Sequence, residues 1–131
     1  MTLRILPLFA LLLLGALPPL STDDLKTDAS LVVVVEVLQV FDRVHRRDGT
    51  STDHRYLIEV KVKSVEKGDG ARPDMLLYAR AWQPAKRPEG WTGPQGQNVV
   101  PGPGDVVRFY LRRAKDGGLS LLSPNGVEPM K

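Results

Sequence analysis

Residues 55–63 read Arg55-Tyr56-Leu57-Ile58-Glu59-Val60-Lys61-Val62-Lys63, an almost regular alternation of polar and apolar side chains. Side chains along a β-strand point to opposite faces with a period of two, so the apolar positions share one face. These positions are Tyr56, Ile58, Val60 and Val62. The stretch therefore predicts a strand with one buried face. Val65 falls out of phase, which predicts a bulge near Lys63 and Ser64.

The preceding segment, Leu31–Phe41, is dominated by valine. Its length and its β-branched side chains favour a long central strand over a helix. Glu36 and Gln39 interrupt it, so one face of this strand is expected to be partly wet. Residues 42–54 are polar and contain Asp48-Gly49, which predicts a loop or the end of a hairpin.

Three shorter strands are expected downstream. The third is Asp74–Trp82, with Leu77, Ala79 and Ala81 on one face, and the fourth is Asp105–Arg112, with Val107, Phe109 and Leu111 inward. A turn at residues 115–118 leads to the fifth strand, Leu119–Leu122. The turn residues 123–126 are expected to end the ordered part, and no helix is predicted.

Five strands of this kind predict an all-β domain: a small five-stranded antiparallel barrel of the oligonucleotide/oligosaccharide-binding type, following an N-terminal signal segment. Closure removes the exposed edges that an open sheet of this size would leave. An open sandwich is the alternative. Residues 83–104 form a Pro/Gly-rich loop, a length without secondary structure that is often functional or mobile.

The N-terminus has the features of a secretory leader. Arg4 supplies a positive charge, and residues 5–17 are uncharged and apolar but short for a membrane span. We expect a signal peptide over residues 1–21, cleaved near Ser21, with Ala16 as the other small residue; an uncleaved anchor is the alternative. Residues 22–30 are then a polar arm and 31–131 a single barrel domain, secreted or periplasmic, without a transmembrane span.

Composition excludes several kinds of function. The 131 residues suffice for one domain, and the chain has no cysteine. This excludes disulfides, thiolate catalysis, zinc ribbons, iron–sulfur sites and a lipoprotein anchor. The net charge of +3 is only mildly basic. No nucleophile elbow, zinc-protease motif or phosphate-binding loop is present, so we expect no enzyme and no cofactor.

Several patterns together resemble secreted bacterial domains of the netrin-like type, the superfamily that includes the tissue inhibitors of metalloproteinases. They are the valine-rich opening strand, Tyr56-x-Ile58-x-Val60 ending in Glu66-Lys67-Gly68, Pro103-Gly104-Asp105-Val106-Val107-Arg108-Phe109, and Asp116-Gly117-Gly118. The resemblance implies a five-stranded barrel and an extracytoplasmic binding module. Those inhibitors present an N-terminal cysteine to the protease zinc, so the absence of cysteine excludes that mechanism here.

Two basic clusters are candidates for a ligand site. Arg43, Arg46 and Arg47 lie between the first two strands, and Arg112 and Arg113 lie at the last hairpin. In such barrels the first and last inter-strand loops border the usual ligand face, so the two clusters could together bind a polyanion, with Tyr110 and Trp82 as stacking surfaces. The alternative is that these arginines only solvate loop tips.

Trp82 and Trp91 bracket a proline-rich segment and are the preferred interaction site. Tryptophans bury a large area at low entropic cost, which suits anchors for a sugar or a partner protein. The alternative is that one of them pins the loop onto the barrel.

His45 and His54, with aspartates nearby, have suitable metal ligands but no rigid spacing, so a solvated loop is favoured and no metal site is expected. The sequence thus predicts an exported, non-enzymatic binding module whose partner is an unknown protein or an anionic polymer. A polyanion or nucleic-acid binder is the alternative, and a metal-dependent enzyme comes third.

Overall fold

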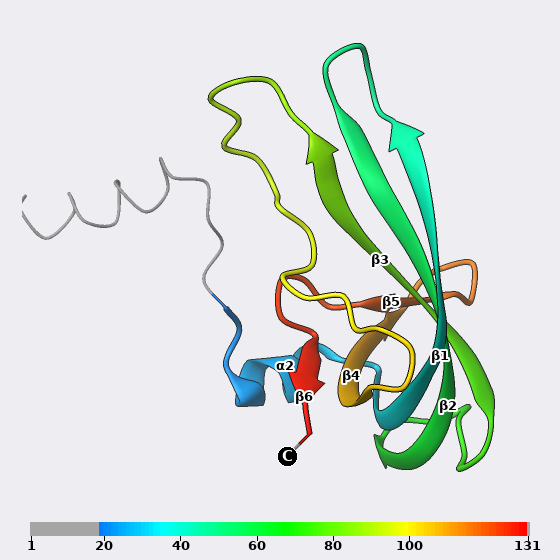
Figure 1. Ribbon diagram of the computed structural model, residues 1–131. Helices are drawn as coiled ribbons and strands as arrows, with labels where there is room; N and C mark the ends of the chain where they lie inside the picture. The colour runs from blue at the N-terminus through cyan, green and yellow to red at the C-terminus, as the bar shows by residue number, and fades with distance from the viewer. Residues whose placement is uncertain (1–18, 131) are drawn as a thin grey trace, which may run out of the picture.

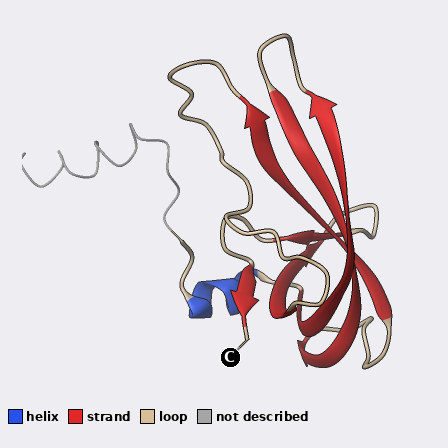
Figure 2. Cartoon of the chain, in the orientation of Figure 1, coloured by secondary structure: helices blue, strands red, loops and turns tan. Residues whose placement is uncertain are grey.

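The computed structural model describes residues 19–130, which form one short helix and six strands (Figures 1 and 2). Residues 1–18, which carry most of the expected leader, and Lys131 lie outside the described part. The elements are α2 (Thr22–Asp28), β1 (Leu31–Arg46), β2 (Thr52–Lys67), β3 (Leu76–Lys86), β4 (Val106–Arg113), β5 (Leu119–Leu121) and β6 (Val127–Pro129).

Five of the strands close into a barrel. The hydrogen-bonded order is β1-β2-β3-β5-β4, and β4 returns to pair with the first part of β1. This confirms the predicted all-β five-stranded barrel and contradicts the open sandwich. One detail of the prediction is wrong: β3 and β5 run parallel, because a long connection carries the chain from β3 to β4 before β5 is reached.

The barrel core has the side chains that the alternation predicted. Ile58, Val60 and Val62 of β2 are fully buried, as is Phe109 of β4. Leu77 and Ala81 of β3 pack against this core, with Ala79 buried between them. The predicted bulge is confirmed, since Val34 pairs with Ser64 while Val35 pairs with Val62.

The first hairpin is longer than the sequence predicted. Of the two predicted alternatives for residues 42–54, the end of a hairpin is confirmed and the loop is wrong: both strands continue to a turn at residues 47–51, so that a ribbon of β1, β2 and β3 rises above the barrel (Figure 1). At the turn, the Asp48 carboxylate accepts hydrogen bonds from the backbone N–H groups of Thr50 (2.8 Å) and Ser51 (2.9 Å). Polar residues are tolerated in the outer part of β1 because most side chains of residues 42–46 stay exposed.

The expected polar arm of residues 22–30 contains a helix. Ser21 caps α2 by accepting a hydrogen bond from the Asp24 N–H through its Oγ (3.0 Å), and Asp23 and Asp24 lie in the positive first turn. Leu25 is buried against Val32 and Tyr110, which form a second apolar cluster outside the barrel. Seven residues are too few for a helical period to be recognised in the sequence.

Order also continues past the predicted end at residue 126. Strand β6 pairs antiparallel with β4, placing Val127 opposite Phe109 and Glu128 opposite Arg108. Its three residues are too short to give an alternation signal. Within residues 19–130, no helix is long and apolar enough to cross a membrane.

Candidate binding face

The register of the ribbon places two rows of side chains together on its outer face. One row consists of Phe41, Leu57 and Arg80, and the next of Arg43, Arg55 and Trp82. Residues directly opposite each other on neighbouring strands share a face. The row of Val40, Ile58 and Ala79 belongs to the core, so the two alternate rows point away from it.

These rows border an open groove of about 990 Å³. Strands β1, β2 and β3 form its floor, and residues of the long loop and of β5 lie at its margins. Its lining residues are Phe41, Asp42, Arg43, Arg47, Asp53, Arg55, Tyr56, Leu57, Arg80, Ala81, Trp82, Pro94, Ser120, Leu121 and Ser123. The groove thus combines four arginines with exposed apolar side chains, since Phe41 is 49% and Leu57 39% exposed.

The arginines of the groove differ in their partners. Arg80 donates a hydrogen bond to Asp116 (2.9 Å), and this contact lowers the pKa of the Asp116 carboxyl. Arg43 and Arg55 are exposed and directly opposite each other on β1 and β2. No acidic side chain of residues 19–130 forms a salt bridge with either of them. Two like charges therefore face one another without a counterion from the chain.

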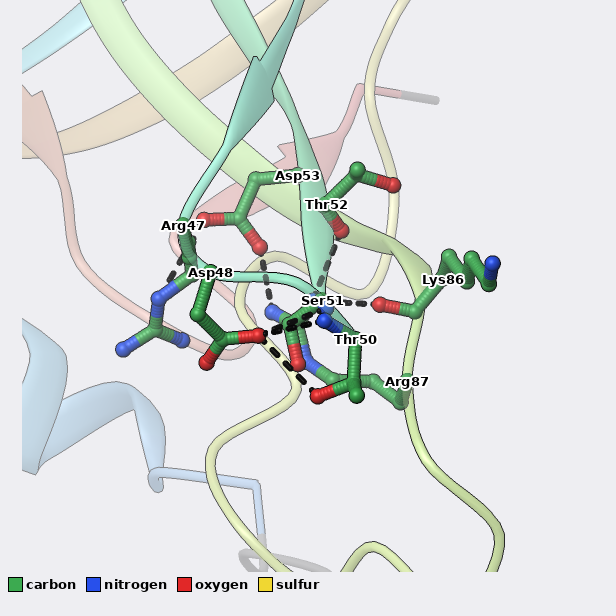
Figure 3. A network of polar contacts seen from close by, with 8 residues as sticks. All are labelled: Arg47, Asp48, Thr50, Ser51, Thr52, Asp53, Lys86 and Arg87. Carbon is green, nitrogen blue, oxygen red and sulfur yellow. Dashed lines mark hydrogen bonds and ion pairs between the residues drawn. The ribbon is translucent and has the colours of Figure 1, made fainter.

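Arg87 fixes the long loop beside the groove. Its guanidinium lies 5.2 Å from the Trp91 ring centroid and 6.0 Å from that of Trp82. It donates to the buried Asp53 carboxylate and, over 2.7 Å, to the Thr52 carbonyl (Figure 3). Both tryptophans thus help to pin the loop, and Trp82 also lines the groove.

Only part of the predicted polyanion site comes together. Arg43, Arg47 and Trp82 line the groove, whereas Arg46 alternates to the opposite face of the ribbon. The Arg47 Nε atom lies 3.8 Å from the Asp53 Oδ2 atom, a contact drawn in Figure 3. The first cluster is therefore divided between the two faces.

The second basic cluster does not converge with the first. The Arg113 guanidinium donates to the Asp69 carbonyl (3.1 Å) in the turn between β2 and β3, and Arg112 lies opposite Ser120, outside the groove lining. Tyr110 is no stacking surface: it is fully buried, and its hydroxyl donates to Glu128 (3.2 Å). Burial raises the pKa of this tyrosine.

The two histidines lie on opposite faces of the ribbon. His54 is paired with Val44, and the next position, His45, is paired with Asp53. The His54 Nδ1 atom lies 3.0 Å from an oxygen of Asp42. In the part of the chain that the structure describes, no group of three or more histidine, cysteine, aspartate or glutamate side chains is arranged to hold a metal ion.

Four residues of the two outer rows were not among the predicted site residues: Phe41, Arg55, Leu57 and Arg80. The alternation in residues 55–63 does place Arg55 and Leu57 on the polar face, which is a usable signal. The sequence does not show the strand register, which places Arg43 opposite Arg55 and Arg55 opposite Trp82.

No family model, curated protein or solved structure matches the chain.

Proposed function

We propose that the chain is an exported, non-enzymatic binding domain and that the outer face of β1, β2 and β3 binds an anionic ligand. The observation that carries this proposal is the direct opposition of Arg43 and Arg55 across two strands. Like charges directly opposite each other destabilise a sheet. A carboxylate or phosphate between the two guanidinium groups would remove this repulsion and accept hydrogen bonds from both.

Apolar surface beside the arginines favours a ligand that has apolar groups as well as negative charge. Phe41 and Leu57 are exposed in the row next to the arginine pair. Trp82 lies in the row of the arginines, directly opposite Arg55. Burying these side chains on binding would add hydrophobic free energy of roughly 25 cal/mol per Å². The ligand class is therefore an anion attached to apolar or aromatic groups, and not a small inorganic ion.

The groups in the groove favour binding over catalysis. Its two aspartates are both in contact with basic side chains, Asp42 with His54 and Asp53 with Arg87. No histidine lines it, and the general acid–base pair that hydrolysis usually needs is not apparent among its lining residues. Export rests on the apolar leader in residues 1–21, and the netrin-like resemblance is consistent with an extracytoplasmic binding module.

A single-stranded nucleic acid is a second candidate ligand. Arginines interleaved with the exposed Phe41 and the half-buried Trp82 are the combination that binds phosphates and stacked bases. The first candidate class is a protein or polymer whose anions are carboxylates. The two classes differ in which probe binds more tightly.

The test is a titration of the purified protein, followed by Trp82 and Trp91 fluorescence, with poly-glutamate and with oligothymidine. We expect saturable binding that weakens steeply between low salt and about 1 M salt, where the Debye length falls to about 3 Å. Arg43→Gln and Arg55→Gln should each weaken binding about tenfold. Arg72→Gln, an equal loss of charge at the exposed turn before β3, is the control. Equal binding by all three variants would contradict the proposed site.

A further inference from the structure

Strand β1 has an open edge along its second half. Strand β4 pairs with β1 only from Leu31 to Glu36, and two further backbone hydrogen bonds join Val37 to Gly104 and Asp105. Beyond that point β1 continues to Arg46 and pairs on its other side with β2. Figure 1 shows this part of β1 rising clear of the barrel beside β2. Within the described residues, no strand pairs with the outer edge of residues 38–46.

The backbone groups on that edge can be assigned from the hairpin turn. The Arg47 N–H donates to the Ser51 carbonyl (3.0 Å), so the polar groups of Arg47 point toward β2. Successive residues of a strand point their N–H and C=O groups to alternate sides. The groups of Asp42, Val44 and Arg46 consequently point away from β2, toward the open edge, where they are available to another strand.

This edge lacks two of the residue types that commonly protect a strand from pairing. Residues 38–46, Leu38-Gln39-Val40-Phe41-Asp42-Arg43-Val44-His45-Arg46, contain no proline and no lysine. Val44 is 62% exposed and Phe41 49% exposed, so the edge offers apolar contacts as well as hydrogen bonds. Edge strands of this kind accept extended peptides from partner proteins through main-chain hydrogen bonds.

The charge of the strand selects the kind of peptide. Residues 38–47 carry three arginines, at positions 43, 46 and 47, and one acidic residue, Asp42, which already contacts His54. Arg43 faces Arg55 on its other side. A strand added at the edge would place one set of its alternate side chains beside Arg43, on the outer face, and the other set beside the exposed Val44, on the opposite face. Acidic residues suit the first set and apolar residues the second.

From these features we propose that an extended acidic segment of a partner protein, with acidic and apolar residues in alternation, adds to the sheet as a strand along residues 38–46. This proposal rests on the proposed function, because Arg43 and Phe41 belong to the same outer face. A second copy of this chain is the less suitable occupant, since it would bring one arginine-rich edge against another. A nucleic acid would use the arginines but has no peptide groups for the edge.

The experiment uses the full chain and nine-residue peptides of three kinds, all with blocked termini. The first alternates Glu and Val, the second alternates Lys and Val, and the third is the Glu–Val peptide with N-methyl groups on alternate backbone nitrogens, made in both phases. We expect the Glu–Val peptide to bind and the Lys–Val peptide not to bind. One phase of N-methylation should weaken binding about tenfold or more, because it removes the N–H groups that pair with the edge.

The matched variants are Arg43→Glu and Arg72→Glu. In the first, the new carboxylate would face Arg55, so the variant should fold at least as stably as the original chain. It should nevertheless bind the Glu–Val peptide about tenfold or more weakly, whereas Arg72→Glu should bind like the original. Loss of binding in Arg43→Glu, with an unchanged melting temperature, therefore supports the proposed edge site.

The remaining outcomes separate the two proposals. If both N-methylated peptides bind as tightly as the unmodified one, strand addition is overturned while anion binding on the outer face stands. If neither the acidic peptide nor poly-glutamate nor oligothymidine binds, both proposals fail together. If the purified protein is a dimer that the Arg43→Glu substitution or the Glu–Val peptide leaves intact, while Val44→Lys dissociates it, the edge is occupied by a second copy and the acidic-peptide proposal is overturned.

Discussion

The side-chain amide of Asn125 holds the backbone of Leu20 through two hydrogen bonds. The Leu20 N–H donates to the Asn125 Oδ1, and the Asn125 Nδ2 donates to the Leu20 carbonyl, each over 2.9 Å. The two residues are 105 positions apart in the sequence. Leu20 also packs against the cluster of Leu25 and Tyr110. Leu20 is therefore part of the folded domain, although it precedes the helix.

Replacing Asn125 measures how much this contact contributes to the free energy of unfolding. Asn125→Ala leaves the Leu20 N–H and C=O groups without their partner, and we expect a loss of about 1–3 kcal/mol in the free energy of unfolding. Urea denaturation measures it. Asn98→Ala is the control, because the Asn98 side chain is exposed. If the two variants unfold at the same urea concentration, the contact between Asn125 and Leu20 adds nothing to stability.

The same contact bears on processing of the proposed leader. Cleavage after Ser21 would remove both Leu20 and the residue that caps α2. We therefore expect signal cleavage on the N-terminal side of Leu20, with Ala16 as the small residue available in the sequence. Mass spectrometry of the protein recovered from outside the cytoplasm checks this. A mature N-terminus at Thr22 would contradict the expectation.

The loop anchor at Arg87 should be a large contributor to stability. The side chains of Arg87 and Asp53 are 8% and 6% exposed, so Arg87→Ala leaves a buried carboxylate with only Arg47 nearby. We expect a loss of about 3–5 kcal/mol and faster proteolysis of residues 88–98. Lys86→Ala, at the exposed neighbouring position, is the control and should change neither the stability nor the rate of proteolysis. A thermal melt like that of the control would show that the two tryptophans hold the loop without the ion pair.

Two glycines with similar backbones allow a sharper comparison. Gly90 (φ +78°) and Gly96 (φ +70°) both have the left-handed conformation, but a Cβ at Gly90 would meet nothing, whereas one at Gly96 would collide with the Trp82 carbonyl. Gly96→Ala should therefore destabilise by about 1–3 kcal/mol more than Gly90→Ala. Paired denaturation curves measure the difference. Equal curves would mean that the loop shifts freely away from β3.

Acid should weaken the contact between β2, β4 and β6. Arg108 donates to Glu66 (2.6 Å) and to Glu128, and the hydrogen bond from Arg108 lowers the pKa of Glu66 below its ordinary value of 4.5. A depressed folded-state pKa gives stability that is present above pH 4.5 and is lost as the pH falls further. Glu66→Gln should cost roughly 0.2–1 kcal/mol at pH 7 and flatten the decline below pH 4.5. An unchanged acid profile would contradict this assignment.

The sequence was most informative where one face of a strand is buried in the barrel. The alternation in β2 predicted Ile58, Val60 and Val62 in the core, and a single extra residue revealed the bulge at Lys63. The alternation is less informative toward the tip of the ribbon, because polar side chains occur there on both faces, Asp42 and His54 on one and Arg43 and Arg55 on the other. There Asp42 and His54 lie in strands held by cross-strand pairing, which the sequence of one strand does not record.

The candidate site was only partly predictable for a related reason. Arg43, Arg47 and Trp82 were identified by residue type, but Arg55 and Arg80 join them only through the register of β2 and β3. Tyr110 was misplaced because its strand is covered on both faces, by the barrel on one and by α2 on the other. Because α2 has only seven residues, its sequence shows no helical periodicity from which the burial of Tyr110 could be predicted.

Closure of the barrel has a consequence for the order in which the chain acquires structure. The start of β1 pairs with β4, so Leu31 finds Leu111 only after most of the chain has been made. Pairings of such long sequence separation form slowly, because the loop between them must close first. A chain that crosses a membrane from its N-terminus, as the proposed leader requires, would thus stay unfolded and threadable until its last strands emerge.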